Sequence, residues 1–170
     1  RGGDPVLNRL KNRTEEPAIY QPVTVAQILG WNWPRSAERK DYANFGAQDR
    51  AYVAGFNARS VVTEGYLLEV KLQGPETSNC GIPYPTEEDF HLWIVGSNLE
   101  DKATSVVVEV SPRVRRDRPD LFLSNLQKLV GKKIRVYGWV MFDPEHPDQV
   151  GKTRGTLWEI HPVMKVEEVK

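Results

Sequence analysis

A change of periodicity near residue 58 constrains the fold of this 170-residue chain more than any other feature. From there on, apolar and polar residues alternate, which is typical of strands with one buried face. The alternating runs lie at 62–72, 90–94, 106–110, 134–142 and 158–163. Between the third and the fourth run, residues 120–130 have helical spacing instead and end at Gly131. The predicted order is three strands, one helix and two strands.

This order predicts a mainly β fold, an OB-fold-like five-stranded Greek-key barrel in which one helix connects strands three and four. The long first run fits such a barrel because its strand must curve and pair on both sides. Gly65 is placed to allow a bend or a bulge there. A mixed α+β sheet is the alternative. We therefore expect residues 60–170 to form a barrel domain.

Residues 1–59 have a different character, with many turn-forming and charged residues and weak apolar periodicity. Thr24 predicts the N-cap of a short helix that Gly30 and Pro34 end. Residues 35–50 are polar and fit either a charged loop or a frayed helix. We expect residues 1–59 to be a partly helical extension packed on the barrel, because they hold too few core residues for a second domain.

Composition excludes several classes of protein. The 23 basic and 23 acidic residues give a net charge of zero, so nucleic-acid binding would depend on a local patch. No apolar stretch approaches the ~18 residues of a membrane span. Cys80 is the single cysteine, which excludes an internal disulfide and a multi-cysteine zinc site. Because the chain begins Arg-Gly-Gly-Asp, we expect a fragment or a processed form.

Each of the three histidines has a carboxylate within two positions. Residues i and i+2 of a strand share a face, so Asp89 projects with His91, and Glu159 with His161. Imidazole and carboxylate together suit a divalent ion or a general acid/base pair. The catalytic candidates are His91, Glu109, Glu159 and His161; the metal candidates, for zinc or manganese, are Asp89, His91, Glu109 and His161. The alternative is a set of local ion pairs, with Glu159 and His161 bonded to Arg113 or Arg154.

Aromatic and basic residues predict a second kind of site. OB folds stack bases or sugars on exposed aromatic side chains, and residues 112–135 are strongly basic within this neutral chain. The candidate ligand-binding residues are Trp93, Arg113, Arg115, Arg116, Lys133, Tyr137 and Trp139. The alternative, which we favour, is that the extension covers the aromatic side chains, because exposed apolar patches of that size are uncommon.

Several strings resemble a group of poorly characterised bacterial OB-fold-like proteins. They lie at 79–80, 89–91, 106–113, 138–146 and 154–162, and the last has the pattern Arg-x-Thr-x-Trp-Glu-Ile-His-Pro. The resemblance implies proteins of exported or lipoprotein type, and hence an extracytoplasmic location. Such relatives are labelled nucleic-acid binding by fold alone, and the resemblance implies no reaction.

Three functions are consistent with the sequence. The leading hypothesis is a non-enzymatic binding domain for single-stranded nucleic acid or another oligomer. The second is a divalent-metal-dependent phosphoester hydrolase that uses the histidine and carboxylate cluster, with Asp143 and His146 from a neighbouring loop. The third is a structural or interaction protein of the cell envelope. No HExxH, GxSxG or phosphate-loop string is present to favour the second.

Overall fold

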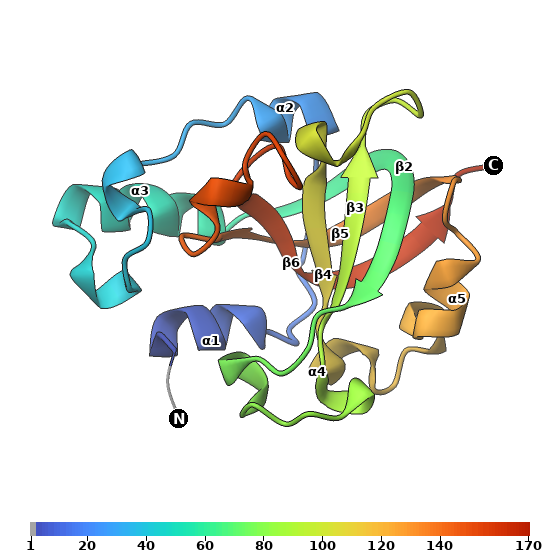
Figure 1. The fold of residues 1–170 in the computed structure, drawn as a ribbon, viewed down its shortest axis with the longest axis horizontal. Helices are drawn as coiled ribbons and strands as arrows, with labels where there is room; N and C mark the ends of the chain where they lie inside the picture. The colour runs from blue at the N-terminus through green and yellow to red at the C-terminus, as the bar shows by residue number, and fades with distance from the viewer. Residues whose placement is uncertain (1–2) are drawn as a thin grey trace.

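Five strands close into a barrel in the computed structural model, which describes residues 3–170 (Figure 1). The barrel strands are β2 (Ser60–Leu72), β3 (Phe90–Val95), β4 (Val106–Val110), β5 (Lys133–Phe142) and β6 (Trp158–Glu168). The short strand β1 (Gln21–Pro22) precedes them in the chain. The α-helices are α1 (Pro5–Lys11), α2 (Val25–Leu29), α3 (Ala47–Asn57), α4 (Pro112–Arg115) and α5 (Leu123–Gln127). None of the helices in residues 3–170 has the length and apolar character needed to cross a membrane.

The pairing of the strands is that of an OB barrel. The curved strand β2 pairs antiparallel with β5 through its first half and with β3 through its second half. Antiparallel pairs also join β3 to β4 and β5 to β6, and a parallel contact of β4 with β6 closes the barrel at Val108 and Ile160. The predicted fold class is therefore confirmed. The short strand β1 adds to β2 in parallel.

The interior consists of residues from one face of each predicted run. Leu92, Val108, Val140 and Ile160 are buried there with almost no exposed surface. The bulge of β2 lies between Leu67 and Glu69, two residues beyond the glycine expected to allow it. Alternation thus positions one set of side chains in the core and leaves the other set on the outer faces of the strands.

The segment between β4 and β5 differs from the single helix predicted over 120–130. It holds α4, a 3₁₀ turn at Pro119–Leu121 and the short helix α5. Pro112 and Pro119 each stand in the first turn of a new element, where a fixed φ and a missing N–H are tolerated. Gly131 ends the segment with a φ of 81°.

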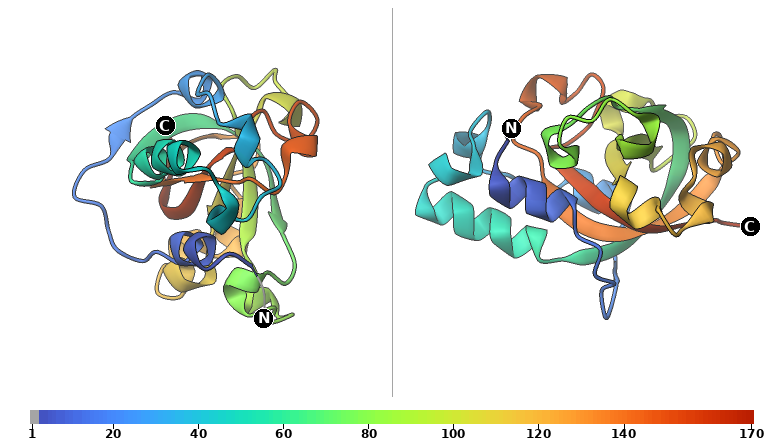
Figure 2. Two further views of the ribbon diagram at one scale, coloured as in Figure 1. Left: turned by 90° about the vertical axis from the view of Figure 1, so that its left-hand side faces the viewer. Right: turned by 90° about the horizontal axis from the view of Figure 1, so that it is seen from below.

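The extension lies outside the barrel strands (Figure 2). Arg13 is buried, and its guanidinium donates hydrogen bonds to the carbonyl oxygens of Asn57, Val140 and His161. The helix predicted at Thr24 is α2, which begins with a capping box formed by Thr24 and Gln27. The polar stretch over 35–50 contains two 3₁₀ turns and the start of α3. The extension is therefore fixed to β5 and β6 by buried hydrogen bonds.

Gly138 gives a test of the packing between β5 and β6. A Cβ at this position would lie 2.5 Å from both Ile160 Cγ2 and the carbonyl oxygen of Pro162. We expect Gly138→Ala to lower the free energy of unfolding by about 2–3 kcal/mol, measured by guanidinium denaturation. Gly55→Ala in α3 is the control, because no atom lies within 4 Å of its added Cβ; it should stabilise by about 0.5–1 kcal/mol. Equal stability of the two variants would contradict this account.

Candidate functional site: an ionic network beneath an inter-loop pocket

Histidine and carboxylate side chains meet on the outer faces of β3, β4 and β6. His91 stands directly opposite Glu109 in the antiparallel pair of β3 and β4. Val108 pairs with Ile160, and Glu109, the residue after Val108, therefore lies beside Glu159 and His161. The structure thus brings together five of the residues that the sequence analysis placed on one surface: Asp89, His91, Glu109, Glu159 and His161.

These side chains form a chain of close contacts that runs inward from His91. His91 Nε2 lies 2.8 Å from Glu109 Oε1, and Glu109 Oε2 lies 3.0 Å from His161 Nδ1. On the other side of the imidazole, His161 Nε2 is 3.5 Å from Asp89 Oδ2. Asn79 donates a hydrogen bond to the second oxygen of Asp89. His161 is therefore enclosed between carboxylates at both ring nitrogens.

A second arm joins this chain through Arg154. The guanidinium of Arg154 pairs with Glu159 and, at 2.5 Å, with Asp143. The same oxygen of Asp143 lies 2.7 Å from His146 Nδ1. The alternative reading of Glu159, as a residue bonded to Arg154, therefore describes the structure. Arg154 is 2% exposed although it belongs to a loop, so this ion pair fixes the loop to β6.

A third arm reaches the extension. Lys11 in α1 pairs with Glu76 at 3.0 Å, and Glu76 faces His91 at 3.8 Å. The complete ionic network then has ten members: Lys11, Glu76, Asp89, His91, Glu109, Asp143, His146, Arg154, Glu159 and His161. With neutral histidines its five carboxylates exceed its two fixed cations by three charges. Protonation of the three histidines would balance this excess, and a bound divalent cation would remove two of the three charges.

Burial and neighbouring charge shift the pKa values of the network in opposite directions. Burial opposes a charge on His161, but Glu109, Glu159 and Asp89 raise its pKa to about 10. Burial would raise the pKa of Glu109, yet His91 and His161 hold it well below its usual value. For Asp89 burial prevails, and its pKa rises to about 6. The innermost part of the network is thus a charged imidazolium held by carboxylates.

A pocket of about 210 Å³ lies over the outer end of the network. We call it the inter-loop pocket. The β5–β6 loop (residues 143–157) supplies four of its residues, β2, β3 and β4 supply four more, and the β2–β3 loop (residues 73–89) and the β3–β4 loop supply Gln73 and Lys102. His91 and His146 both line it, and the carboxylates that contact them lie behind. The full lining is Lys71, Gln73, His91, Trp93, Lys102, Val107, His146, Gln149, Thr153 and Arg154.

Two of the predicted ligand-binding residues are buried and have structural contacts. Trp93 is 8% exposed, its indole N–H donates to the carbonyl of Thr153, and the ammonium of Lys102 lies 3.8 Å from its ring centre. Arg115 is 5% exposed, and it donates to three backbone carbonyls, one of them that of Val110. Loops cover the second face of β3, so Trp93 is no exposed stacking platform, and the binding of a ligand by these two residues stays a prediction.

The other predicted ligand-binding residues are spread over different surfaces. On β5, Lys133 pairs with Glu64, Tyr20 packs edge-on against Tyr137, and Trp139 donates to a carbonyl of the extension. Arg113 and Arg116 are exposed, but they line another hollow beside α4. The extension thus covers part of the aromatic surface, and the seven residues do not form one groove.

The four predicted metal candidates do not form one group either. Their ligand atoms fall into two triads that share Glu109, one with Glu76 and His91 and one with Asp89 and His161. Sequence analysis missed Glu76 and Lys11, because neither lies in a periodic segment next to a histidine. The sequence analysis placed Asp143 and His146 together in one loop, and the two side chains are in contact.

Comparisons with known proteins add a structural likeness. No protein-family model and no curated protein matches the chain. Among solved structures, it is similar to the crystal structure of yeast Stn1 and Ten1, at 12% identity and a TM-score of 0.46, over 95% of this chain and 69% of that chain. The assignment of the OB class rests on the strand order and register described above. The resemblance to exported bacterial proteins remains a prediction.

His146 provides a pH-dependent test of this site. Its hydrogen bond with Asp143 raises its pKa to about 8, with Glu159 adding to the effect and Arg154 opposing it. We expect an NMR titration to show this pKa, and Asp143→Asn to lower it toward about 6.5. Because the folded pKa exceeds the unfolded one, the stabilisation is complete below about pH 6.5 and is lost as the pH rises through about 8. A pKa at or below 6.5 in the unaltered protein would contradict the pairing.

Proposed function

We propose that the protein is an OB-type binding domain that takes a phosphate group of single-stranded nucleic acid in the inter-loop pocket. The observation that supports this most directly is the chemistry of the lining. None of the ten residues that line the pocket is acidic, whereas Lys71, Lys102 and Arg154 are cationic. None of the five carboxylates of the ionic network lines this pocket. Lys102 pairs with Glu69, and Arg154 with Asp143 and Glu159, so Lys71 is the most accessible of the three cations.

The position of the pocket supports the same proposal. OB folds bind oligonucleotides and oligosaccharides on the face of their second and third strands, between the loops that join strands one to two and four to five. In this chain those strands are β3 and β4, and the loops are residues 73–89 and 143–157. A lining of amines, imidazoles and amides favours a phosphodiester over a neutral sugar.

The size and surroundings of the pocket limit what it takes. About 210 Å³ is smaller than a drug-sized ligand site, and it suits one charged group of a longer molecule. Trp93 forms a wall of the pocket and is covered by Lys102, so it provides no stacking platform. Affinity should therefore come chiefly from the phosphate charge and depend strongly on salt.

A second candidate function, phosphoester hydrolysis, is favoured by the two histidines of the pocket. Each has a carboxylate oxygen within 2.8 Å, an arrangement that orients an imidazole for proton transfer. His146 is mostly protonated at neutral pH and can give its proton to the leaving oxygen. His91 would take a proton from a water molecule. The oxygen of that water would bond to phosphorus while the bond between phosphorus and the leaving oxygen breaks.

Binding is tested with a short labelled single-stranded oligonucleotide and fluorescence anisotropy at low salt. We expect the double variant Lys71→Gln/Lys102→Gln to weaken binding at least fivefold and to reduce the salt slope by about 1.4, at ~0.7 for each phosphate contact. The control Lys128→Gln/Lys132→Gln removes the same charge far from the pocket and should change affinity less than twofold. Undetectable binding by the unaltered protein, or equal loss in both variants, would overturn the proposal.

Hydrolysis is tested separately, by following cleavage of the same oligonucleotide with and without added Zn²⁺ or Mn²⁺. If the second candidate is correct, His146→Gln should lower the rate about 100-fold or more, since a general acid contributes ~10²–10⁴. Lys128→Gln should leave the rate unchanged. Binding without any cleavage would agree with the binding-domain proposal and contradict the proposal of phosphoester hydrolysis.

A further inference from the structure

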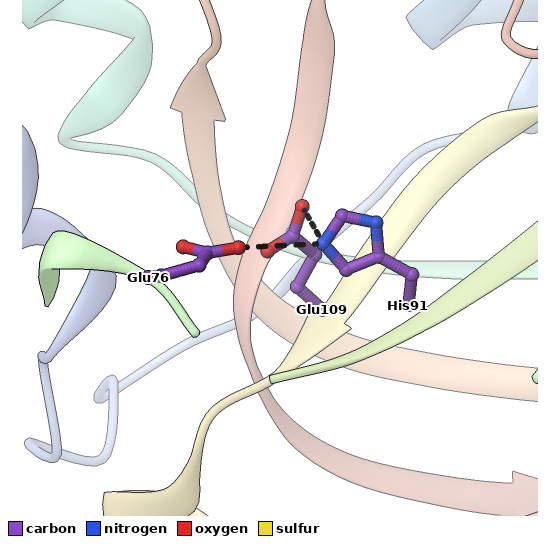
Figure 3. A group of neighbouring side chains, drawn as sticks. All are labelled: Glu76, His91 and Glu109. Atoms are coloured by element: carbon purple, nitrogen blue, oxygen red, sulfur yellow. Dashed lines mark ion pairs between the residues drawn. The ribbon is translucent and has the colours of Figure 1, made fainter. Parts of the chain in front are cut away.

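Glu76, His91 and Glu109 converge at the outer end of the ionic network (Figure 3). A single imidazole nitrogen, His91 Nε2, faces both carboxylates, at 2.8 Å from Glu109 Oε1 and 3.8 Å from Glu76 Oε1. The three residues come from the β2–β3 loop, β3 and β4. Chain segments far apart in sequence therefore direct one nitrogen and two oxygens to the same point.

The imidazole nitrogen at this point lacks a hydrogen-bond partner. His91 Nε2 is buried and makes no hydrogen bond, although it lies 2.8 Å from Glu109 Oε1. Glu109 Oε2 also has none, but it faces His161 and not this point. The two residues are 9% and 3% exposed. A buried polar atom without a partner costs about 1–3 kcal/mol, so His91 Nε2 favours a ligand that bonds to it.

The spacing and the donor types fit a divalent transition metal. With bonds of about 2.1 Å, neighbouring ligand atoms of a tetrahedral ion lie ~3.4 Å apart, and the two distances at His91 Nε2 fall on either side of this value. One imidazole and two carboxylates suit Zn²⁺ or Mn²⁺ better than Mg²⁺ or Ca²⁺, which prefer oxygen alone.

Each carboxylate of this triad is also held from behind by a basic group. Glu76 directs Oε1 to His91 and Oε2 to Lys11, at 3.0 Å. Glu109 directs Oε1 to His91 and Oε2 to His161. Lys11 and His161 therefore orient the carboxylates without using the oxygens that face His91, which is how residues around metal ligands commonly act.

The two neighbouring acidic groups fit a metal less well. In the triad of Asp89, Glu109 and His161, the closest oxygens lie at opposite nitrogens of one imidazole, which suits an imidazolium between two carboxylates. In the group of Asp143, Glu145 and His146, the guanidinium of Arg154 already neutralises the oxygen of Asp143 that faces His146.

We propose that Glu76, His91 and Glu109 bind one divalent metal ion, Zn²⁺ or Mn²⁺. This site does not depend on the nucleic-acid proposal, because its two carboxylates do not line the pocket and it uses none of the lysine or arginine side chains there; His91 belongs to both. A metal here would partly balance the excess negative charge of the network. It would also lower the pKa of a bound water molecule, and the second candidate function needs such a water to lose its proton beside His91.

The test uses the full chain, stripped with a chelator and titrated with ZnCl₂ or MnCl₂ in a calorimeter, with bound metal counted by elemental analysis. We expect one equivalent per chain for the unaltered protein, loss of stoichiometric binding in His91→Ala, and at least tenfold weaker binding in Glu76→Gln. His146→Ala is the matched control, a pocket histidine outside the triad, and should keep one equivalent.

Circular dichroism and thermal unfolding establish that each variant is folded. If His91→Ala does not fold, Glu76→Gln decides, because Glu76 is half-buried in a loop and its amide keeps the shape of the side chain. No stoichiometric binding by the unaltered protein overturns the site. Binding that survives both substitutions, or that His146→Ala removes, overturns the assignment of its ligands.

Discussion

The ionic network joins the extension, both long loops and three barrel strands through buried charges. Moving a charge out of water costs several kcal/mol, so such groups are stable only when all their partners are in place. Arg154 illustrates this dependence, because Asp143 lies at one end of its loop and Glu159 lies in β6 beyond the other end. The position of the β5–β6 loop, and with it one wall of the inter-loop pocket, follows from these two ion pairs.

The fold was largely predictable because the barrel interior requires a period of two. Leu92, Val108 and Ile160 stand at every second position of their runs whatever covers the outside, so the strand positions and their order follow from the sequence. The helices of the extension were harder to find. Helix α3 begins at Gly46, which has no side chain to cap it, and its first turns are polar and exposed. Nothing in such a segment distinguishes a helix from a charged loop.

The site was predictable only in part, for a related physical reason. The i, i+2 rule places Asp89 with His91 and Glu159 with His161, but it does not show what lies over them. Loops cover the outer face of β3, so Trp93 is buried although its strand alternates like a half-exposed one. Glu76 and Lys11 come from segments without periodicity and meet across 65 residues of sequence. Contacts of this kind depend on the tertiary fold.

The parallel contact of β4 with β6 has a consequence for how firmly the barrel is closed. The two strands share a single register pair, Val108 with Ile160, while Glu109 and His161 beside them form an ion pair. Side-chain charge therefore strengthens the seam where the backbone ladder is shortest. A change of charge at this seam would therefore alter how firmly the barrel is closed.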